Sequence, residues 1–138
     1  MLKRWLTVGC ALGLLVVFLA TSASPESTTS GVAYFRQNTT LFAAQGAYPG
    51  AMEVRHVTVL LLHQPKTVGT GGLACTHITA AVRECIGTYV LPIGRIQVEG
   101  ETRSSTVYQL AIVGGLGSYA GAGGVASFSQ GLATFFIT

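Results

Sequence analysis

Five polar side chains are the candidates for chemistry in this sequence: Glu53, Arg55, His77, Tyr89 and Tyr108. Histidine is the side chain whose ordinary pKa allows it to gain or lose a proton near neutral pH. A lone histidine in a strand is nevertheless more often structural, and buried tyrosines are often packed rings with one bonded hydroxyl. Serine-hydrolase, phosphate-loop and zinc motifs are absent from the sequence, which argues against hydrolases, kinases and metalloenzymes. We therefore expect no metal site.

Two cysteines, Cys75 and Cys85, remain once the first residues of the chain are set aside as a leader. An even pair in an exported domain predicts a disulfide. A zinc site would need more ligands than these two thiols and the nearby His77, and the spacing is not a zinc pattern. A nucleophilic Cys75 stays open as an alternative, but it requires a free thiol.

The leader begins with a short basic segment, continues with an apolar run at 5–20, and ends in small residues at 21–24. This pattern is typical of a secretory signal peptide, here cleaved after Ala23. The alternative, a membrane anchor, needs about 20 apolar residues to span a bilayer, and this run is shorter. The expected organisation is a signal peptide at 1–23, a flexible leader at 24–31 and one domain at 32–138, in a secreted protein.

The charge of the chain excludes one class of partner. The whole sequence carries a net charge of +3, but Lys3 and Arg4 lie in the leader. The mature chain is therefore nearly neutral and has no basic run, so we expect no nucleic acid and, after cleavage, no membrane as partner.

The remaining sequence is β-rich, since no window has apolar residues at helical spacing for three turns, while short β-branched or aromatic runs recur between turn signals. Eight strands with short connections favour an all-β fold, a closed eight-stranded antiparallel barrel. The expected strands cover 33–44, 54–63, 67–79, 86–91, 94–102, 106–113, 119–129 and 132–138, with a glycine-rich corner at 114–117.

Alternation along the strands predicts which side chains face inward. At 94–101 the charged and amide side chains share one face, which we expect to be solvated. An eight-stranded barrel has an interior just wide enough for side chains or one small ligand. The expected ligand-binding lumen is apolar and lined by Val57, Val59, Leu61, Leu73, Ile96 and Ile112. Apolar residues on both faces of other strands also favour a homo-oligomer, a dimer or trimer.

Three glycine-rich segments carry a resemblance. Residues 112–124 read Ile-Val-Gly-Gly-x-Gly-x-Tyr-x-Gly-Ala-x-Gly, residues 68–76 contain Val-Gly followed by a cysteine, and residues 91–100 read Leu-Pro-x-Gly-x-Ile-x-Val-x-Gly. In this order they resemble the allene oxide cyclase barrel and dirigent protein superfamily, over roughly 40–138. The resemblance implies an eight-stranded barrel in which Cys75 and His77 face the lumen.

The same resemblance implies an activity without a cofactor. Allene oxide cyclases steer ring closure of an unstable fatty-acid epoxide, and dirigent proteins hold phenoxy-type intermediates so that coupling gives one stereoisomer. Both impose one conformer on a reactive ligand. The active-site residues of the family are not matched, since Val59 stands in place of a lumen asparagine and Gly123 in place of an arginine. Two readings follow: a secreted cyclase or dirigent-like protein acting on a small hydrophobic intermediate, or a non-catalytic barrel that binds an apolar ligand or has a structural role.

Overall fold

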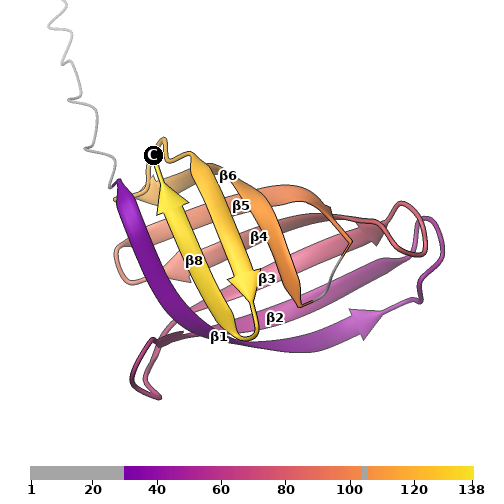
Figure 1. Cartoon of the computed structure of the whole chain (residues 1–138), viewed down its shortest axis with the longest axis horizontal. Helices are drawn as coiled ribbons and strands as arrows, with labels where there is room; N and C mark the ends of the chain where they lie inside the picture. Colours follow the sequence, from indigo (N-terminus) through magenta and orange to yellow (C-terminus); the bar gives the residue numbers. More distant parts are fainter. Residues whose placement is uncertain (1–29, 104–105) are drawn as a thin grey trace, which may run out of the picture.

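Eight antiparallel strands form a closed barrel in the computed structural model, which describes residues 30–103 and 106–138 (Figure 1). The predicted signal peptide and most of the predicted leader lie outside the described residues. The strands are β1 Gly31–Ala44, β2 Met52–Leu61, β3 Thr67–His77, β4 Arg83–Leu91, β5 Gly94–Thr102, β6 Val107–Gly117, β7 Gly124–Ser129 and β8 Leu132–Ile137.

Each strand pairs with the next one in sequence, and β1 closes the barrel by pairing with β8 between Gly31 and Arg36. The predicted all-β barrel is therefore confirmed. Because a closed meander leaves few backbone groups at an edge, a sheet of this size needs no helix to cover it. Within the described residues no helix is long and apolar enough to cross a membrane.

The predicted glycine corner at 114–117 was wrong, because these residues continue β6. The chain turns at 118–121 instead, and β7 begins at Gly124 rather than at residue 119. Sterics explain why this stretch needs glycine: a Cβ on Gly115 would lie 2.4 Å from the carbonyl oxygen of Tyr119 and 2.6 Å from that of Arg95. The glycines here permit close backbone approach more than they bend the chain.

The centre of the barrel is filled by aromatic rings. Tyr89, Phe128 and Phe135 are at most 1 % exposed, and their ring centroids lie 5.2–6.1 Å apart. Contacts at these distances are typical of favourable aromatic pairs. Side chains of alternate residues on β2 to β6 complete the core. The middle of the barrel is thus a packed core, and open space lies toward its ends: about 80 Å³ beside the start of β1 and the end of β8, and about 210 Å³ at the other end.

That end carries the β1–β2, β3–β4, β5–β6 and β7–β8 connections. The first half of β1 pairs with β8, whereas its second half pairs with β2 and extends beyond β8 (Figure 1). Two backbone hydrogen bonds of 2.8 Å, Gly50 N–H to His77 O and His77 N–H to Ala51 O, join the β1–β2 connection to the end of β3. We call this end the mouth.

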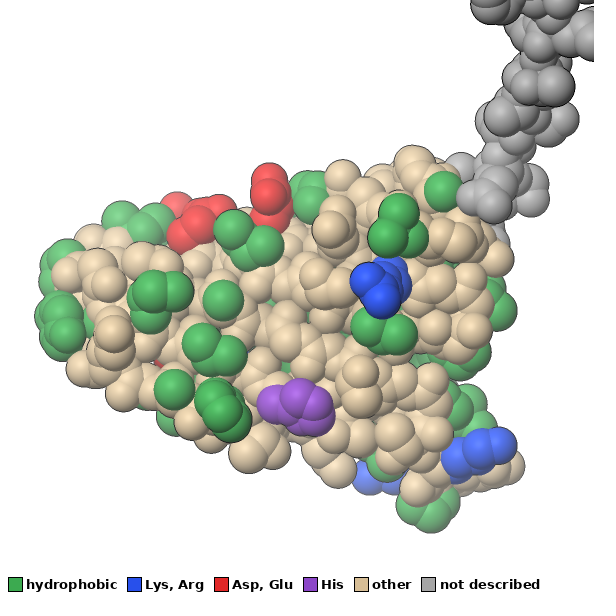
Figure 2. Space-filling model, turned by 180° about the vertical axis from the view of Figure 1, so that it is seen from behind, with side chains coloured by type: hydrophobic (Ala, Val, Ile, Leu, Met, Phe, Trp, Pro, Cys, Tyr) green, Lys and Arg blue, Asp and Glu red, His purple; other side chains and the backbone are tan. Residues whose placement is uncertain are grey.

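The outer wall carries the charged face predicted for β5, with Arg95, Gln97, Glu99 and Glu101 all exposed. Hydrophobic side chains are also scattered over the outside, as Figure 2 shows for the back of the molecule. They include Phe42, which is 81 % exposed at a bulge in β1, and Ile86, which is 60 % exposed. These residues fit the predicted assembly into oligomers, which stays a prediction.

Candidate functional site

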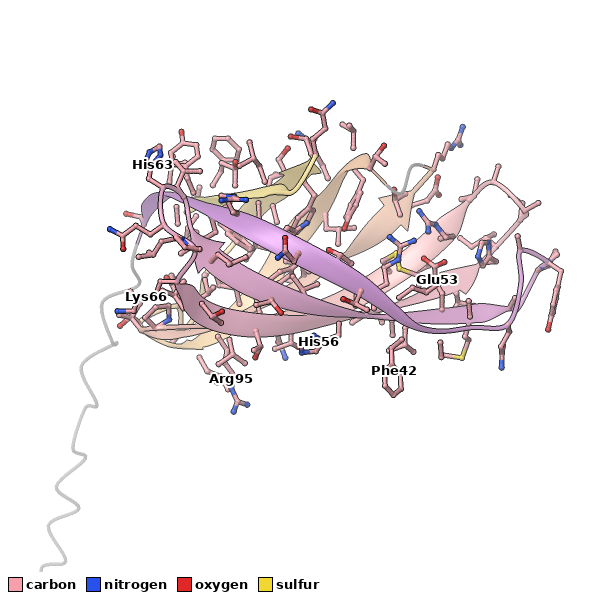
Figure 3. The ribbon with its side chains drawn as sticks, turned by 90° about the horizontal axis from the view of Figure 1, so that it is seen from below. Phe42, Glu53, His56, His63, Lys66 and Arg95 are labelled. Carbon is pink, nitrogen blue, oxygen red and sulfur yellow. A yellow bond between two sulfur atoms is a disulfide. The ribbon has the colours of Figure 1, made fainter. Side chains whose placement is uncertain are left out.

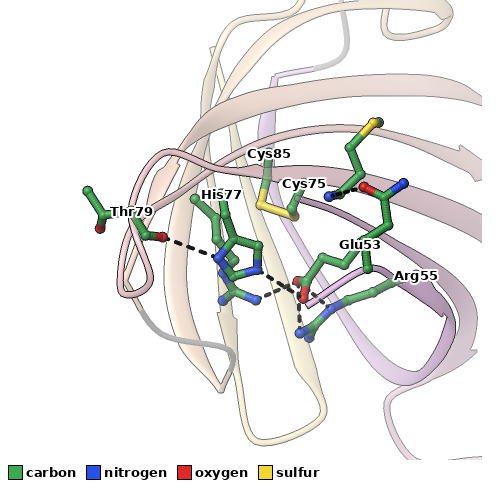
Figure 4. Close-up of polar contacts among 9 residues, drawn as sticks. Glu53, Arg55, Cys75, His77, Thr79 and Cys85 are labelled. Atoms are coloured by element: carbon green, nitrogen blue, oxygen red, sulfur yellow. Dashed lines mark hydrogen bonds and ion pairs between the residues drawn. A yellow bond between two sulfur atoms is a disulfide. The ribbon is translucent and has the colours of Figure 1, made fainter. Parts of the chain in front are cut away.

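Glu53 on β2 is the centre of a charge cluster inside the mouth (Figure 4). Its Oε1 atom accepts a hydrogen bond from Nη1 of Arg83, and lies 3.0 Å from Nη2 and 3.1 Å from Nε of Arg55. Nε2 of His77 lies 3.9 Å from the Oε2 atom of the same carboxylate. The structure therefore brings together three of the five residues singled out in the sequence, Glu53, Arg55 and His77, and adds Arg83.

The strand register explains this convergence. Glu53 lies opposite Cys75 across β2 and β3, and Cys75 lies opposite Cys85 across β3 and β4. One inward position further along, His77 lies opposite Arg83. Side chains two residues apart share a face of a strand. The three strands thus stack their inward residues in two adjacent rows at the mouth.

The predicted disulfide between Cys75 and Cys85 is confirmed. Both cysteines are buried, at 3 % and 2 % exposed, beside the charge cluster (Figure 4). Because both thiols are used in the bond, the alternative of a nucleophilic Cys75 does not apply to this oxidised form.

The second ring nitrogen of His77, Nδ1, contacts the connection between β3 and β4. Its Nδ1 atom lies 3.3 Å from the carbonyl oxygen of Thr79, which can only accept a hydrogen bond. Nδ1 therefore carries a proton, and Nε2 is the nitrogen that faces Glu53. The hydroxyl of Thr79 accepts hydrogen bonds from the backbone N–H groups of Ala81 and Val82, so the β3–β4 connection orients the imidazole ring.

A pocket of about 210 Å³ opens beside this cluster. It has an aromatic side, formed by Tyr108 and Phe128, whose rings stack with centroids 4.8 Å apart. The opposite side is polar and includes Arg55. We call this the mouth pocket; its lining residues are Gln37, Thr39, Arg55, Thr106, Tyr108, Phe128, Ser129, Gln130 and Gly131.

A narrow cleft leads from the mouth pocket toward the disulfide. Arg55 and Tyr108 border both spaces, and the cleft also contacts Glu53, Arg83 and both cysteines. Its volume of about 10 Å³ is at the lower limit for a single water molecule. The charge cluster is therefore largely dry, and its charges are weakly screened.

Tyr108 stands between the aromatic core and the arginines. Burial raises the pKa of its phenol, the guanidinium groups of Arg55 and Arg83 lower it, and the carboxylate of Glu53 raises it. Burial is the largest of these effects, so the hydroxyl stays protonated at neutral pH and can donate a hydrogen bond at the pocket wall.

Comparisons with known proteins were made for the sequence and for the fold. No protein family and no curated protein is matched by the sequence. The fold matches a solved structure of pyocyanin demethylase with a TM-score of 0.65 and 23 % identity, over 78 % of this chain and 100 % of that one. It also matches the pterocarpan synthase dirigent proteins PsPTS1 and GePTS1, with TM-scores of 0.55 and 0.58. Their identities are 18 % and 16 %, over 75 % and 79 % of this chain and 88 % and 87 % of theirs.

The chain has the dirigent-like barrel fold. The expected fold from the glycine-rich segments is therefore confirmed. At identities below 25 % the likeness extends to the fold, and the chemistry has to be argued from the residues of this barrel.

Tyr89, the fourth candidate from the sequence, lies away from the mouth pocket of this dirigent-like barrel. It is fully buried, and its hydroxyl donates to Oε1 of Gln37 at 3.5 Å. Burial holds the pKa of its phenol well above the usual range, and repulsion from Tyr108 adds to this effect. Its position is that of a core residue that supports Gln37 at the pocket wall.

The expected lumen residues lie in the barrel interior but border little open space. Val57, Val59, Leu73, Ile96 and Ile112 are 0–4 % exposed in the core, and Leu61 is partly buried near the end opposite the mouth. Leu73 borders the narrow cleft. Contact of these side chains with a ligand stays a prediction.

Sequence reasoning missed Arg83, Gln37 and Phe128. Arg83 precedes Cys85 by two residues, so alternation could have placed it on the same inward face. Gln37 and Phe128 come from strands far apart in sequence, and nothing local marks them as pocket residues. Among the described residues, no group of three or more histidine, cysteine, aspartate or glutamate side chains could hold a metal ion. What the cluster offers is fixed positive charge near an aromatic surface, which suits binding, orientation and stabilisation of developing negative charge.

Proposed function

We propose that this protein is an exported, cofactor-independent barrel that binds a small, planar hydrophobic molecule in the mouth pocket and directs its cyclisation or coupling. The observation that carries this proposal is the two-sided lining of the mouth pocket. One side is the stacked pair of Tyr108 and Phe128, and the other is polar and includes Arg55. Small-molecule sites combine apolar or aromatic surface with placed polar groups, and the mouth pocket offers both, with polar residues in the majority.

The size of the pocket limits the ligand. At about 210 Å³ it is smaller than the roughly 300–1,000 Å³ of pockets for drug-sized ligands, so we expect a molecule of one to three rings. Tyr108 would hold such a ring system by stacking, and Phe128, itself packed between Tyr108 and Tyr89, keeps the Tyr108 ring in place. A reactive molecule held in one orientation reacts through fewer conformers, which is catalysis by positioning.

Arg55, which lines the mouth pocket, is the residue we propose to act on the reacting atoms, and Arg83 adds positive charge behind it. They lie near the pocket in a nearly dry cluster, where fixed positive charge stabilises an enolate or phenolate that develops during ring closure. Glu53 keeps both arginines in place, and Tyr108 can donate a hydrogen bond to the same oxygen. Nε2 of His77 lies 3.9 Å from the other oxygen of this carboxylate.

Similar folds and the disulfide support the proposal. The named neighbours include a demethylase of pyocyanin and two pterocarpan synthase dirigent proteins, which are small-molecule functions. A buried disulfide favours an oxidising compartment and thus export. A non-catalytic ligand-binding barrel remains the second reading, since the pocket alone would serve it equally.

The test is titration with 1-aminoanthracene, a neutral dye whose fluorescence rises in apolar surroundings. Thr39 lines the mouth pocket and is exposed, so Thr39→Trp should block the entrance and reduce binding about tenfold or more. Thr40→Trp is the matched control, because Thr40 is equally exposed but faces outward opposite His56. Saturable binding that is lost in Thr39→Trp and kept in Thr40→Trp would support the site. Absence of binding, or equal binding by both variants, would contradict it.

Catalysis is tested separately, with candidate reactive intermediates and chiral analysis of products. An excess of one stereoisomer that depends on Arg55 would support the directing role. A bound ligand whose product ratios are the same with and without the protein would leave the non-catalytic reading.

A further inference from the structure

The charges at the mouth pocket restrict the class of ligand more than the volume of the pocket does. Among the described residues that line the pocket, Arg55 is the one charged side chain; the others are neutral polar or aromatic. Glu53, the nearest acid, is 10 % exposed in its side chain and lies behind Arg55 at the narrow cleft rather than at the pocket. A ligand in the pocket therefore meets a guanidinium group and no carboxylate.

One carboxylate balances two guanidinium groups in this cluster. Oε1 of Glu53 accepts from both Arg55 and Arg83, so the three side chains together leave one positive charge in excess. Arg55 contacts Glu53 through Nε and Nη2, whereas Nη1 carries two further N–H donors. The excess charge is weakly screened, because the cleft behind it holds at most about one water molecule.

Figure 3 shows how the barrel separates this cluster from the rest of its charges. Glu53 points into the interior, whereas His56 and Arg95 point away from the barrel, and His63 and Lys66 lie at the end opposite the mouth. Glu101 and Arg103 pair with each other on the surface, with side chains 52 % and 78 % exposed. These surface groups act through solvent and are screened at physiological salt.

We infer that the mouth pocket is selective for an aromatic monoanion, with the ring against Tyr108, which Phe128 backs from the core, and the carboxylate or phenolate on Arg55. This inference rests on the proposed small-molecule site and names the class of its ligand. A single negative charge matches the single excess positive charge. The planar guanidinium group suits a carboxylate, which can accept two parallel hydrogen bonds. The neutral polar residues Gln37, Thr39 and Ser129 can bond further oxygen atoms but do not discriminate by charge.

The test compares two probes of the same ring system, 2-naphthoate and its neutral isostere 2-naphthamide, by calorimetry on the disulfide-intact protein at neutral pH and low salt. We expect 2-naphthoate to bind about tenfold more tightly or better, the usual effect of one charge-assisted hydrogen bond. In Arg55→Gln the ratio of the two affinities should fall to about one, while binding of 2-naphthamide changes little. Arg55→Lys should keep part of the preference, because it retains the charge but not the planar fork.

Arg36→Gln is the matched control, since Arg36 is an exposed arginine on the outer face of the neighbouring β1. It removes the same charge from the protein and should leave the ratio unchanged. Equal affinities of the two probes for the wild-type protein would overturn the charge selectivity and leave the small-molecule site standing. A preference that survives in Arg55→Gln would place the anion elsewhere and overturn the assignment. Binding of neither probe would overturn the proposed function together with this inference.

Discussion

Arg83 on β4 reaches across β3 and donates a hydrogen bond to the carboxylate of Glu53 on β2. The two residues are 30 apart in sequence, and their strands are not neighbours in the barrel. The Cys75–Cys85 bond lies beside this contact, because both cysteines share an inward row with Glu53 and Arg83 lies in the next row. The ion pair joins β2 to β4 and the disulfide joins β3 to β4, so together they hold three strands at the mouth and keep the arginines beside the mouth pocket.

Glu53→Gln should strongly destabilise the barrel. It leaves two guanidinium groups close together with no carboxylate, and breaking a buried ion pair typically costs about 3–5 kcal/mol. Glu101→Gln is the control, because its pair with Arg103 is largely exposed, and such pairs contribute at most about 1 kcal/mol. Urea unfolding of both variants measures the difference. Similar losses in the two variants would mean that Glu53 does not hold the cluster together.

The disulfide should be complete in the purified protein and should stabilise it. Thiol titration of the unfolded, non-reduced protein without its leader should find no free thiol, since both remaining cysteines are bonded. Replacing both by alanine should lower the free energy of unfolding by about 2–3 kcal/mol, as expected for a short closed loop. Two reactive thiols, or an unchanged stability of the double variant, would contradict this prediction.

Gly115 and Gly114 are neighbours on β6 that differ in the space around them, so the effect of alanine can be compared at the two positions. A Cβ on Gly115 would lie 2.4 Å from the carbonyl oxygen of Tyr119, whereas a Cβ on Gly114 would meet its nearest atom, Oε1 of Gln97, at 3.5 Å. We expect Gly115→Ala to cost about 1–3 kcal/mol, the usual cost of overpacking, and Gly114→Ala to be close to neutral. Thermal unfolding of the two variants checks this order. Equal melting temperatures would show that the backbone at Gly115 adjusts freely.

The stability of the protein should fall in alkaline solution because of its buried tyrosines. Burial raises the pKa of Tyr89 well above its ordinary value and also raises that of Tyr108. The unfolded chain ionises its phenols near pH 10, while the folded chain keeps these protons. The contribution of these groups is therefore complete below about pH 10 and is lost as the pH rises toward the folded values.

Tyr89→Phe should reduce this alkaline loss, because it removes the phenol with the larger rise in pKa while keeping the ring in the core. Tyr119→Phe is the comparison, since burial raises the pKa of Tyr119 less strongly. Denaturant unfolding of each variant at about pH 8 and about pH 11 measures the slope. An unchanged slope in Tyr89→Phe would assign the alkaline loss to other groups.

Much of the fold was visible in the sequence because strands have short-range signals. Alternation placed Arg95 and Glu99 outside and Ile96 inside, and the structure agrees. Glycines proved harder to interpret: they predicted a corner at 114–117, where the structure has a strand that another backbone approaches closely. A glycine can serve a turn or a close contact, and the sequence does not distinguish the two.

For the candidate site, too, some features follow from the sequence and others only from the tertiary structure. The sequence by itself determined the strand pattern and the cysteine pair, because these depend on neighbouring residues and on a period of two. The inward side of β3 came from the resemblance to the barrel superfamily. Tertiary structure decided that Arg83 meets Glu53, that Tyr89 packs in the core while Tyr108 reaches the pocket, and that a pocket of about 210 Å³ opens at the mouth. These depend on strand register and on how side chains from distant strands fill a shared volume, and a one-residue shift in register would turn every inward side chain outward.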